Sequence, residues 1–166
     1  MEAASILACG GYPKDADRLL HLGGADVIDD LTGGTQTFID GCKALDSGDS
    51  ESAVRELQAS YDIDDDLDTQ FFLGKAYMAA RRWENAIVIL KDLEAWKGRI
   101  IADQSYPPVI WALAHYYIAV AYDESGQKGQ AISYYSKFLN IWKSGDADLK
   151  PVVDAKRRLA TLSHSR

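Results

Sequence analysis

One stretch decides the fold of this chain: residues 71–90, with the sequence FFLGKAYMAARRWENAIVIL. Apolar residues recur at helical spacing in 71–77 and again in 84–90, and the short link between them predicts a tight turn. We expect the small residues Gly74 and Ala86 where the two helices cross, because a larger side chain would hold the backbones apart. The stretch is therefore predicted to be a helical hairpin, which needs neighbours of its own kind to bury its apolar face.

Two further segments repeat this pattern, each with a small residue in the first helix and an alanine in the second. These small residues are Gly41 and Ala53 upstream, and Ala119 and Ala131 downstream. The first two units are offset by about 33 residues and the third by about a dozen more. The extra length lies in residues 97–108, where the prolines Pro107 and Pro108 cannot continue a helix.

This pattern resembles the tetratricopeptide repeat (TPR), in which a large residue, then Leu-Gly and Tyr, then Ala and a second large residue recur over about 34 residues. The middle unit matches through Leu73, Gly74, Tyr77, Ala86 and Leu90. The third unit matches through Ala119, Tyr122, Ala131 and Tyr135. The first unit departs from the pattern, since Asp40 stands where leucine is usual and Ala44 where tyrosine is usual. The last unit also resembles repeat arrays near the ends of large bacterial signalling proteins.

The resemblance implies an all-α fold, an α-α superhelix (TPR solenoid) of about three helical hairpins with a C-terminal capping helix. The repeats are expected to span 34–66, 67–106 and 107–143, followed by a capping helix and tail at 144–166. Pro151 fits the first turn of that last helix. Residues 1–33 are expected to form an irregular, partly disordered cap, because three Gly-Gly pairs interrupt any helix there.

Composition and charge narrow the functional classes. The chain has 25 acidic and 18 basic side chains, a formal net charge of -7 at pH 7. Nucleic-acid phosphates would be repelled, so no nucleic-acid partner is expected. No apolar run approaches the length of a membrane span. The aspartates of 62–68 lack the glycine and closing glutamate of a calcium loop, and are interpreted as a solvated loop in which Asp66 or Asp68 caps the next helix.

The residues that carry most enzyme chemistry do not form a recognisable set. The histidines His21, His115 and His164 lie at no metal-ligand spacing, and no nucleophile motif is present. His115, among aromatic residues, is interpreted as a hydrogen-bonded packing histidine. We therefore expect no catalytic residues, no metal and no cofactor, and a protein that is not an enzyme.

The two cysteines, Cys9 and Cys42, are far apart in the sequence. They form no disulfide framework, and Cys42 is interpreted as a free thiol that behaves as a small apolar residue at a groove or helix contact. The stretch before Cys9 resembles the cleavage box of a bacterial lipoprotein, but the preceding basic segment is missing and the apolar run is short. The expected location is cytoplasmic; a periplasmic or lipid-anchored protein is the alternative if Cys9 is lipidated.

In the repeat family, the first helix of each hairpin lines the concave side of the superhelix. The groove residues that the resemblance implies are Phe38, Cys42, Leu45, Phe71, Lys75, Met78, Tyr116, Val120 and Asp123. This lining is apolar and aromatic, which suits an extended or helical peptide. The leading hypothesis is therefore a module that binds a peptide or protein partner. Two alternatives stay open: a self-associating scaffold whose groove is filled in a homodimer, and a small-molecule binder or enzyme on a repeat scaffold.

Overall fold

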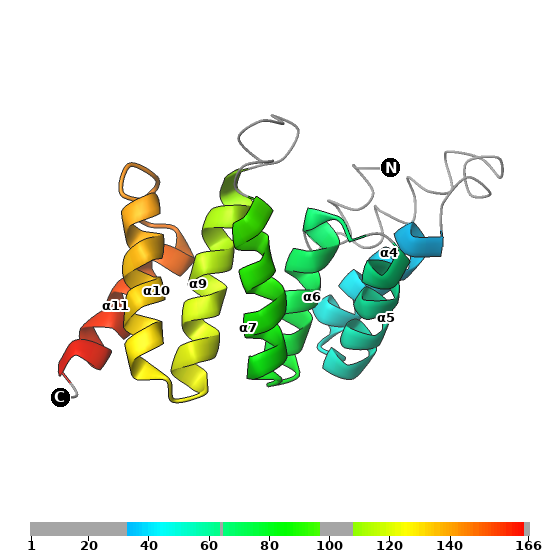
Figure 1. Cartoon of the computed structure of the whole chain (residues 1–166), viewed down its shortest axis with the longest axis horizontal. Coiled ribbons are helices and arrows are strands. Elements are labelled where there is room, and N and C mark those ends of the chain that lie inside the picture. Colours follow the sequence, from blue (N-terminus) through cyan, green and yellow to red (C-terminus); the bar gives the residue numbers. More distant parts are fainter. Residues whose placement is uncertain (1–32, 64, 97–107, 165–166) are drawn as a thin grey trace. The chain divides into compact units, whose positions relative to one another are not determined.

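A computed structural model gives the structure of the chain and describes residues 33–63, 65–96 and 108–164 (Figure 1). Every regular element in these ranges is a helix, as the sequence predicts. The elements are α4 (Gly33–Ser47), α5 (Ser50–Ile63), α6 (Leu67–Ala79), α7 (Trp83–Asp92), the 3-10 turn η1 (Leu93–Trp96), α9 (Pro108–Glu124), α10 (Lys128–Ile141) and α11 (Lys150–His164). The predictions for the N-terminal cap, His21 and Cys9 lie outside the described residues. Within the described ranges, no helix has both the length and the apolar character needed to cross a membrane.

The chain divides into two compact units, with the boundary between Arg82 and Trp83. Unit 1 contains α4, α5 and α6, and unit 2 contains α7, η1, α9, α10 and α11. The boundary lies inside the predicted middle repeat, between its two helices. The repeat boundaries therefore stay predictions.

The core of unit 1 forms where α5 packs against both α4 and α6. Ile39, Leu57 and Leu73 are fully buried there, one from each helix. Gly41 on α4 lies so close to α5 that a Cβ atom in its place would be 2.5 Å from Cγ of Leu57. The predicted close crossing at the small residue of the first repeat is therefore confirmed.

The helices α4, α6 and α9 end in the same backbone turn. In each turn one residue has a positive φ, and its N–H bonds to the carbonyl three residues earlier while the next N–H bonds to the carbonyl five residues earlier. These residues are Gly48 (φ 82°), Arg81 (φ 57°) and Gly126 (φ 80°). Their positions reproduce the offsets between repeats that the sequence predicts, which supports one structural repeat along the chain.

The start of α6 is fixed by a side-chain cap. Asp66 is extended and accepts hydrogen bonds from the backbone N–H groups of Asp68 and Thr69. The prediction that an aspartate of this loop caps the next helix is confirmed for Asp66.

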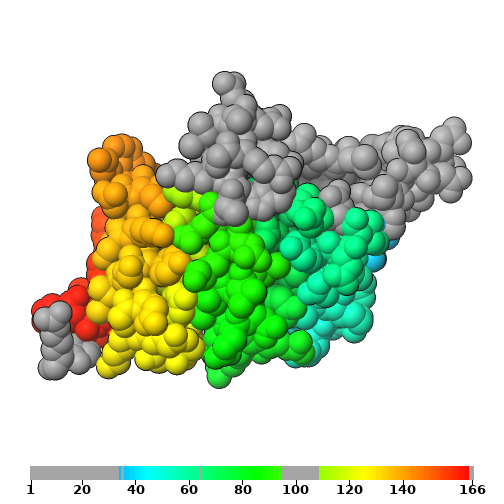
Figure 2. Space-filling model, in the orientation of Figure 1, coloured from blue at the N-terminus to red at the C-terminus, as the bar shows by residue number. Residues whose placement is uncertain are grey.

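The core of unit 2 forms around α9, which packs against α7, α10 and α11. Ile118, Tyr135 and Phe138 are fully buried. The predicted C-terminal helix is present as α11, with Pro151 in its first turn. In Figure 2, α11 (red) emerges from behind α10 (yellow to orange).

Candidate functional site

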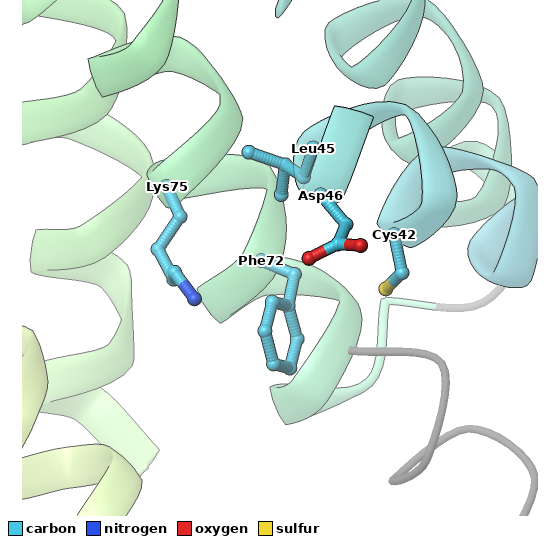
Figure 3. A pocket seen from close by; sticks show the side chains of 5 residues that line it. All are labelled: Cys42, Leu45, Asp46, Phe72 and Lys75. Carbon is cyan, nitrogen blue, oxygen red and sulfur yellow. The ribbon is translucent and has the colours of Figure 1, made fainter. Parts of the chain in front are cut away.

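A hollow of about 230 Å³ lies on unit 1 between α4 and α6 (Figure 3). Its lining residues are Cys42, Leu45 and Asp46 from α4, and Phe72 and Lys75 from α6. Residues three or four positions apart share one face of a helix, which explains why each set reaches the same space. The hollow therefore combines one aromatic ring, two charges of opposite sign and aliphatic walls.

Aromatic packing holds the ring of Phe72 in place. The ring meets Phe38 edge to face, with 5.8 Å between the centroids, and meets Phe71 in the same way at 5.4 Å. Phe38 and Phe71 are themselves buried. The hollow is therefore lined by an aromatic ring that its neighbours orient before any partner binds.

Lys75 carries a positive charge with no carboxylate partner in the described part of the chain. Its Nζ lies 4.7 Å from the centroid of the Phe72 ring and 6.0 Å from that of Phe71. No described carboxylate oxygen lies within 4.0 Å of this nitrogen. Burial lowers the pKa of Lys75, because the charged form loses hydration that the rings replace only in part.

Asp46 places a carboxylate at the rim of the same hollow. It is exposed and comes from the opposite helix to Lys75 (Figure 3). The two charges form no ion pair with each other, so both can meet groups of a ligand. A bound segment could place a cation at Asp46 and an anion at Lys75.

The structure brings only some of the predicted groove residues of unit 1 to this hollow. Cys42, Leu45 and Lys75 line it, Phe38 and Phe71 pack beneath its surface, and half-buried Met78 does not belong to the lining. Sequence reasoning missed Phe72 and Asp46 as lining residues. The spacing of Phe72 to Lys75 on one helix face was the available signal. The recognition role of the whole set stays a prediction.

The interpretation of Cys42 as a free thiol is wrong. The described residues contain no free cysteine, and Cys42 is disulfide-bonded and only 2% exposed. Whether a cysteine is bridged depends on distance and orientation in space, which its position in the sequence does not fix. Cys42 therefore lines the hollow as a buried, disulfide-bonded residue and offers no free thiol there.

Two of the three predicted groove residues of unit 2, Tyr116 and Asp123, are engaged by α11. The hydroxyl of Tyr116 donates to Asp154 at 2.9 Å, and Asp123 accepts from Arg158 at the same distance. Burial, followed by the hydrogen bond to Asp154, raises the pKa of Tyr116. The third residue, Val120, is half-buried.

The basic triplet of α11 differs in part from its interpretation as a solvated face. Lys156 and Arg157 are exposed, as expected, but Arg158 is half-buried and points inward to the acidic side chains of α9. It shares a helix face with Ala155 and Leu162, at spacings of three and four residues, and this spacing directs it toward the core.

His115 is a buried histidine of unit 2, at 2% exposure. Its Nδ1 lies 2.9 Å from the carbonyl oxygen of Trp111, and its Nε2 lies 3.3 Å from Oε1 of Glu94. Lys137 donates to the same carboxylate oxygen at 2.9 Å. Both ring nitrogens are thus engaged within unit 2, which agrees with the predicted hydrogen-bonded packing histidine.

Comparison with known proteins identifies the fold. No protein-family profile and no curated protein matches the sequence. The crystal structure of a variant of a Podosopora anserina putative kinesin light chain with nearly identical TPR-like repeats is similar, with a TM-score of 0.63 and 19% sequence identity over 98% of this chain and 82% of that one. The fold is a TPR-like helical repeat. A second crystal structure of that light chain supports the same TPR-like fold, with a TM-score of 0.61 and 18% identity over 98% of this chain and 83% of that one.

Proposed function

We propose that this chain is a non-catalytic protein-interaction module whose unit 1 binds a peptide segment of a protein partner in the hollow between α4 and α6. TPR-like repeats are scaffolds that present helical surfaces to other chains. The observation that carries the proposal is Lys75, an ammonium held over aromatic rings without a carboxylate partner among the described residues. An anionic side chain placed beside it would restore the favourable interactions that burial removes.

The chemistry of the hollow defines the partner segment. Phe72 offers an aromatic surface for one apolar side chain, Lys75 attracts a carboxylate and Asp46 attracts a cation. A segment with an acidic, an apolar and a basic side chain close together matches all three groups. A purely acidic segment fits less well, because Asp46 and the net charge of -7 would repel it.

A panel of labelled peptides tests this proposal directly. Peptides that carry the acidic–apolar–basic triplet, and versions with each charge neutralised, are titrated against the wild-type chain by fluorescence anisotropy. The Lys75→Met variant keeps the aliphatic stem and removes the charge, and should weaken binding about tenfold, as expected for a lost charge-assisted hydrogen bond. Lys91→Met, at an exposed position of α7, makes the same charge change outside the hollow.

The outcomes separate the possible functions. Equal binding by wild type and Lys75→Met would place recognition outside the hollow and overturn the proposal. Light scattering over a range of concentrations checks the alternative of a self-associating scaffold, which requires a dimer in the absence of any peptide.

A further inference from the structure

Helix α11 is attached to the rest of unit 2 by few buried apolar side chains. Of its 15 residues, Val152 and Ala155 are the buried ones. The segment that precedes the helix, residues 143–148, is exposed throughout. A helix with so few buried side chains has a low free energy of local opening compared with the helices of the core.

A polar network supplies much of the remaining attachment. Arg158 donates through Nε to Asp154 at 2.8 Å, and through Nη1 to Asp123 at 2.9 Å and Glu124 at 3.1 Å. Tyr116 donates to the same Asp154 oxygen, which ties α9 to α11 a second time. These charges are partly exposed, so salt and substitution should weaken the attachment.

Tyr116, which bonds to α11, belongs to an aromatic cluster of α9 and α10. The ring of Tyr116 packs against Tyr117, Phe138 and Tyr135, with centroid distances of 5.1, 5.5 and 6.4 Å. On the face of α9 that contacts α11, Asp123 and Glu124 bind Arg158. Tyrosine and arginine are enriched among the residues that contribute most binding energy at protein interfaces.

We propose that this face of α9 and α10 is a helix-binding site. In the structure it is occupied by α11 of the same chain, and a helix of the same pattern from a partner protein displaces α11. The pattern is read from the contacts of α11 itself. In α11, Asp154 is followed by Arg158 four residues later. The small apolar residues Val152 and Ala155 lie two positions before and one position after Asp154. A partner helix of this pattern has an aspartate, an arginine and two small apolar residues at the same spacings. This inference concerns unit 2 and does not depend on the hollow of unit 1.

Competition with α11 determines the affinity that a partner helix shows. The apparent dissociation constant is the intrinsic one divided by the fraction of molecules in which α11 has opened. A variant that opens α11 without altering the face beneath it should therefore bind such a helix more tightly. The increase equals the factor by which the open fraction rises.

The experiment uses a labelled synthetic peptide of residues 149–164 as the probe, titrated against full-length variants by fluorescence anisotropy. Arg158→Asp breaks the network from the α11 side and leaves every residue of the face in place. Val152→Asp opens the helix through its apolar contact instead. Lys156→Asp, an exposed position of the same helix, is the matched control with the same change of charge. Hydrogen exchange of α9, α10 and α11 is measured on each variant.

The expected result is fast exchange confined to α11 in the two opened variants, with at least about tenfold tighter peptide binding than in wild type and Lys156→Asp. Adding Tyr116→Phe to Arg158→Asp should weaken that binding about tenfold, because the aspartate of the peptide loses its hydrogen-bond donor.

Three outcomes would overturn the proposal. In the first, α11 opens but the peptide binds no better than to Lys156→Asp. In the second, α9 and α10 lose protection together with α11 in both opened variants, which would make α11 part of one cooperative core. In the third, wild-type chains form dimers that Arg158→Asp abolishes, which would assign the face to the α11 of a second copy.

Discussion

The hydroxyl of Tyr116 on α9 donates a 2.9 Å hydrogen bond to Oδ2 of Asp154 on α11, 38 residues further along the chain. Burial alone would raise the pKa of the Asp154 carboxyl. Hydrogen bonds from Arg157 and Tyr116 and the charge of Arg158 outweigh burial, so that the pKa of Asp154 is lowered. The attachment of α11 is therefore coupled to the ionised form of this carboxylate.

Acid should loosen α11 before it unfolds the rest of unit 2. Because the folded pKa of Asp154 lies below the unfolded value of about 3.9, its ionised form stabilises the folded state above that pH, and this contribution is lost as the pH falls through the folded pKa. Hydrogen exchange of α11 as a function of pH measures the effect. In Asp154→Asn the pH dependence should be weaker, and the free energy of unfolding at pH 7 lower by about 1–2 kcal/mol.

The exposed Asp92→Asn, at the end of α7, is the control for this prediction and should change stability by less than about 0.5 kcal/mol. A stability difference between wild type and Asp154→Asn that stays constant down to pH 2 would show that the lowered pKa does not contribute.

Gly41→Ala should destabilise unit 1. Alanine has the higher helix propensity by about 1 kcal/mol, but its Cβ would lie 2.5 Å from Cγ of Leu57 and 3.1 Å from the backbone nitrogen of that residue. Forcing the two helices apart costs about 1–3 kcal/mol, so we expect a net loss of about 1 kcal/mol in chemical denaturation.

Gly129→Ala in α10 is the matched control, because no atom lies within 4 Å of the added Cβ. It should be neutral or stabilising by up to about 1 kcal/mol. Equal changes in the free energy of unfolding for the two substitutions would mean that the close approach at Gly41 does not affect stability.

The crossing at Gly41 was predictable because helical period and residue size decide it locally. The same holds for the cap at Asp66 and for Pro151 in the first turn of α11. The inward direction of Arg158 could also have been derived from its spacing to Ala155 and Leu162, although its charge suggested a solvated face.

Other features depend on which elements meet in three dimensions. Helical period places Phe72 and Lys75 on one face of α6, but only packing shows that Asp46 of α4 borders the same hollow. The disulfide of Cys42 is likewise a spatial relationship, and so is the engagement of Tyr116 by α11. The sequence therefore predicted the helices and turns better than the environments of the candidate site residues.

Arg81→Gly should stabilise the chain. Arg81 has φ 57° at a turn where Gly48 and Gly126 occupy the equivalent positions, and a side chain in this region costs about 1 kcal/mol. Glycine removes that cost but increases the entropy of the unfolded state, so a gain of about 0.5 kcal/mol or more is expected in thermal or chemical unfolding. Arg81→Ala removes the same side chain and keeps the strained φ. A stabilisation by alanine as large as that by glycine would assign the effect to the lost charge.

Lys75→Met should also stabilise unit 1, because it removes a charge from a partly buried site that lacks a described counter-ion. The pKa of Lys75 is lowered by burial, so the folded chain releases this proton at lower pH than the unfolded chain, whose lysine pKa is about 10.4. Below the folded pKa the cost of the buried charge is fully present. Between the two pKa values stability rises with pH, as the folded state becomes neutral first.

We expect Lys75→Met to be more stable than wild type by about 1 kcal/mol at pH 7, in urea denaturation of both proteins. The difference should shrink as the pH rises toward about 10.4, since wild-type Lys75 is then neutral in the folded state. Comparing the two proteins at each pH cancels the titration of the tyrosines. Lys91→Met, at an exposed position, should show no such pH dependence. A lower stability of Lys75→Met than of wild type at pH 7 would mean that the attraction of the ammonium to the rings of Phe71 and Phe72 exceeds the free-energy cost of burying its charge. Lys75 would then stabilise the fold, and its charge would not be available to a partner.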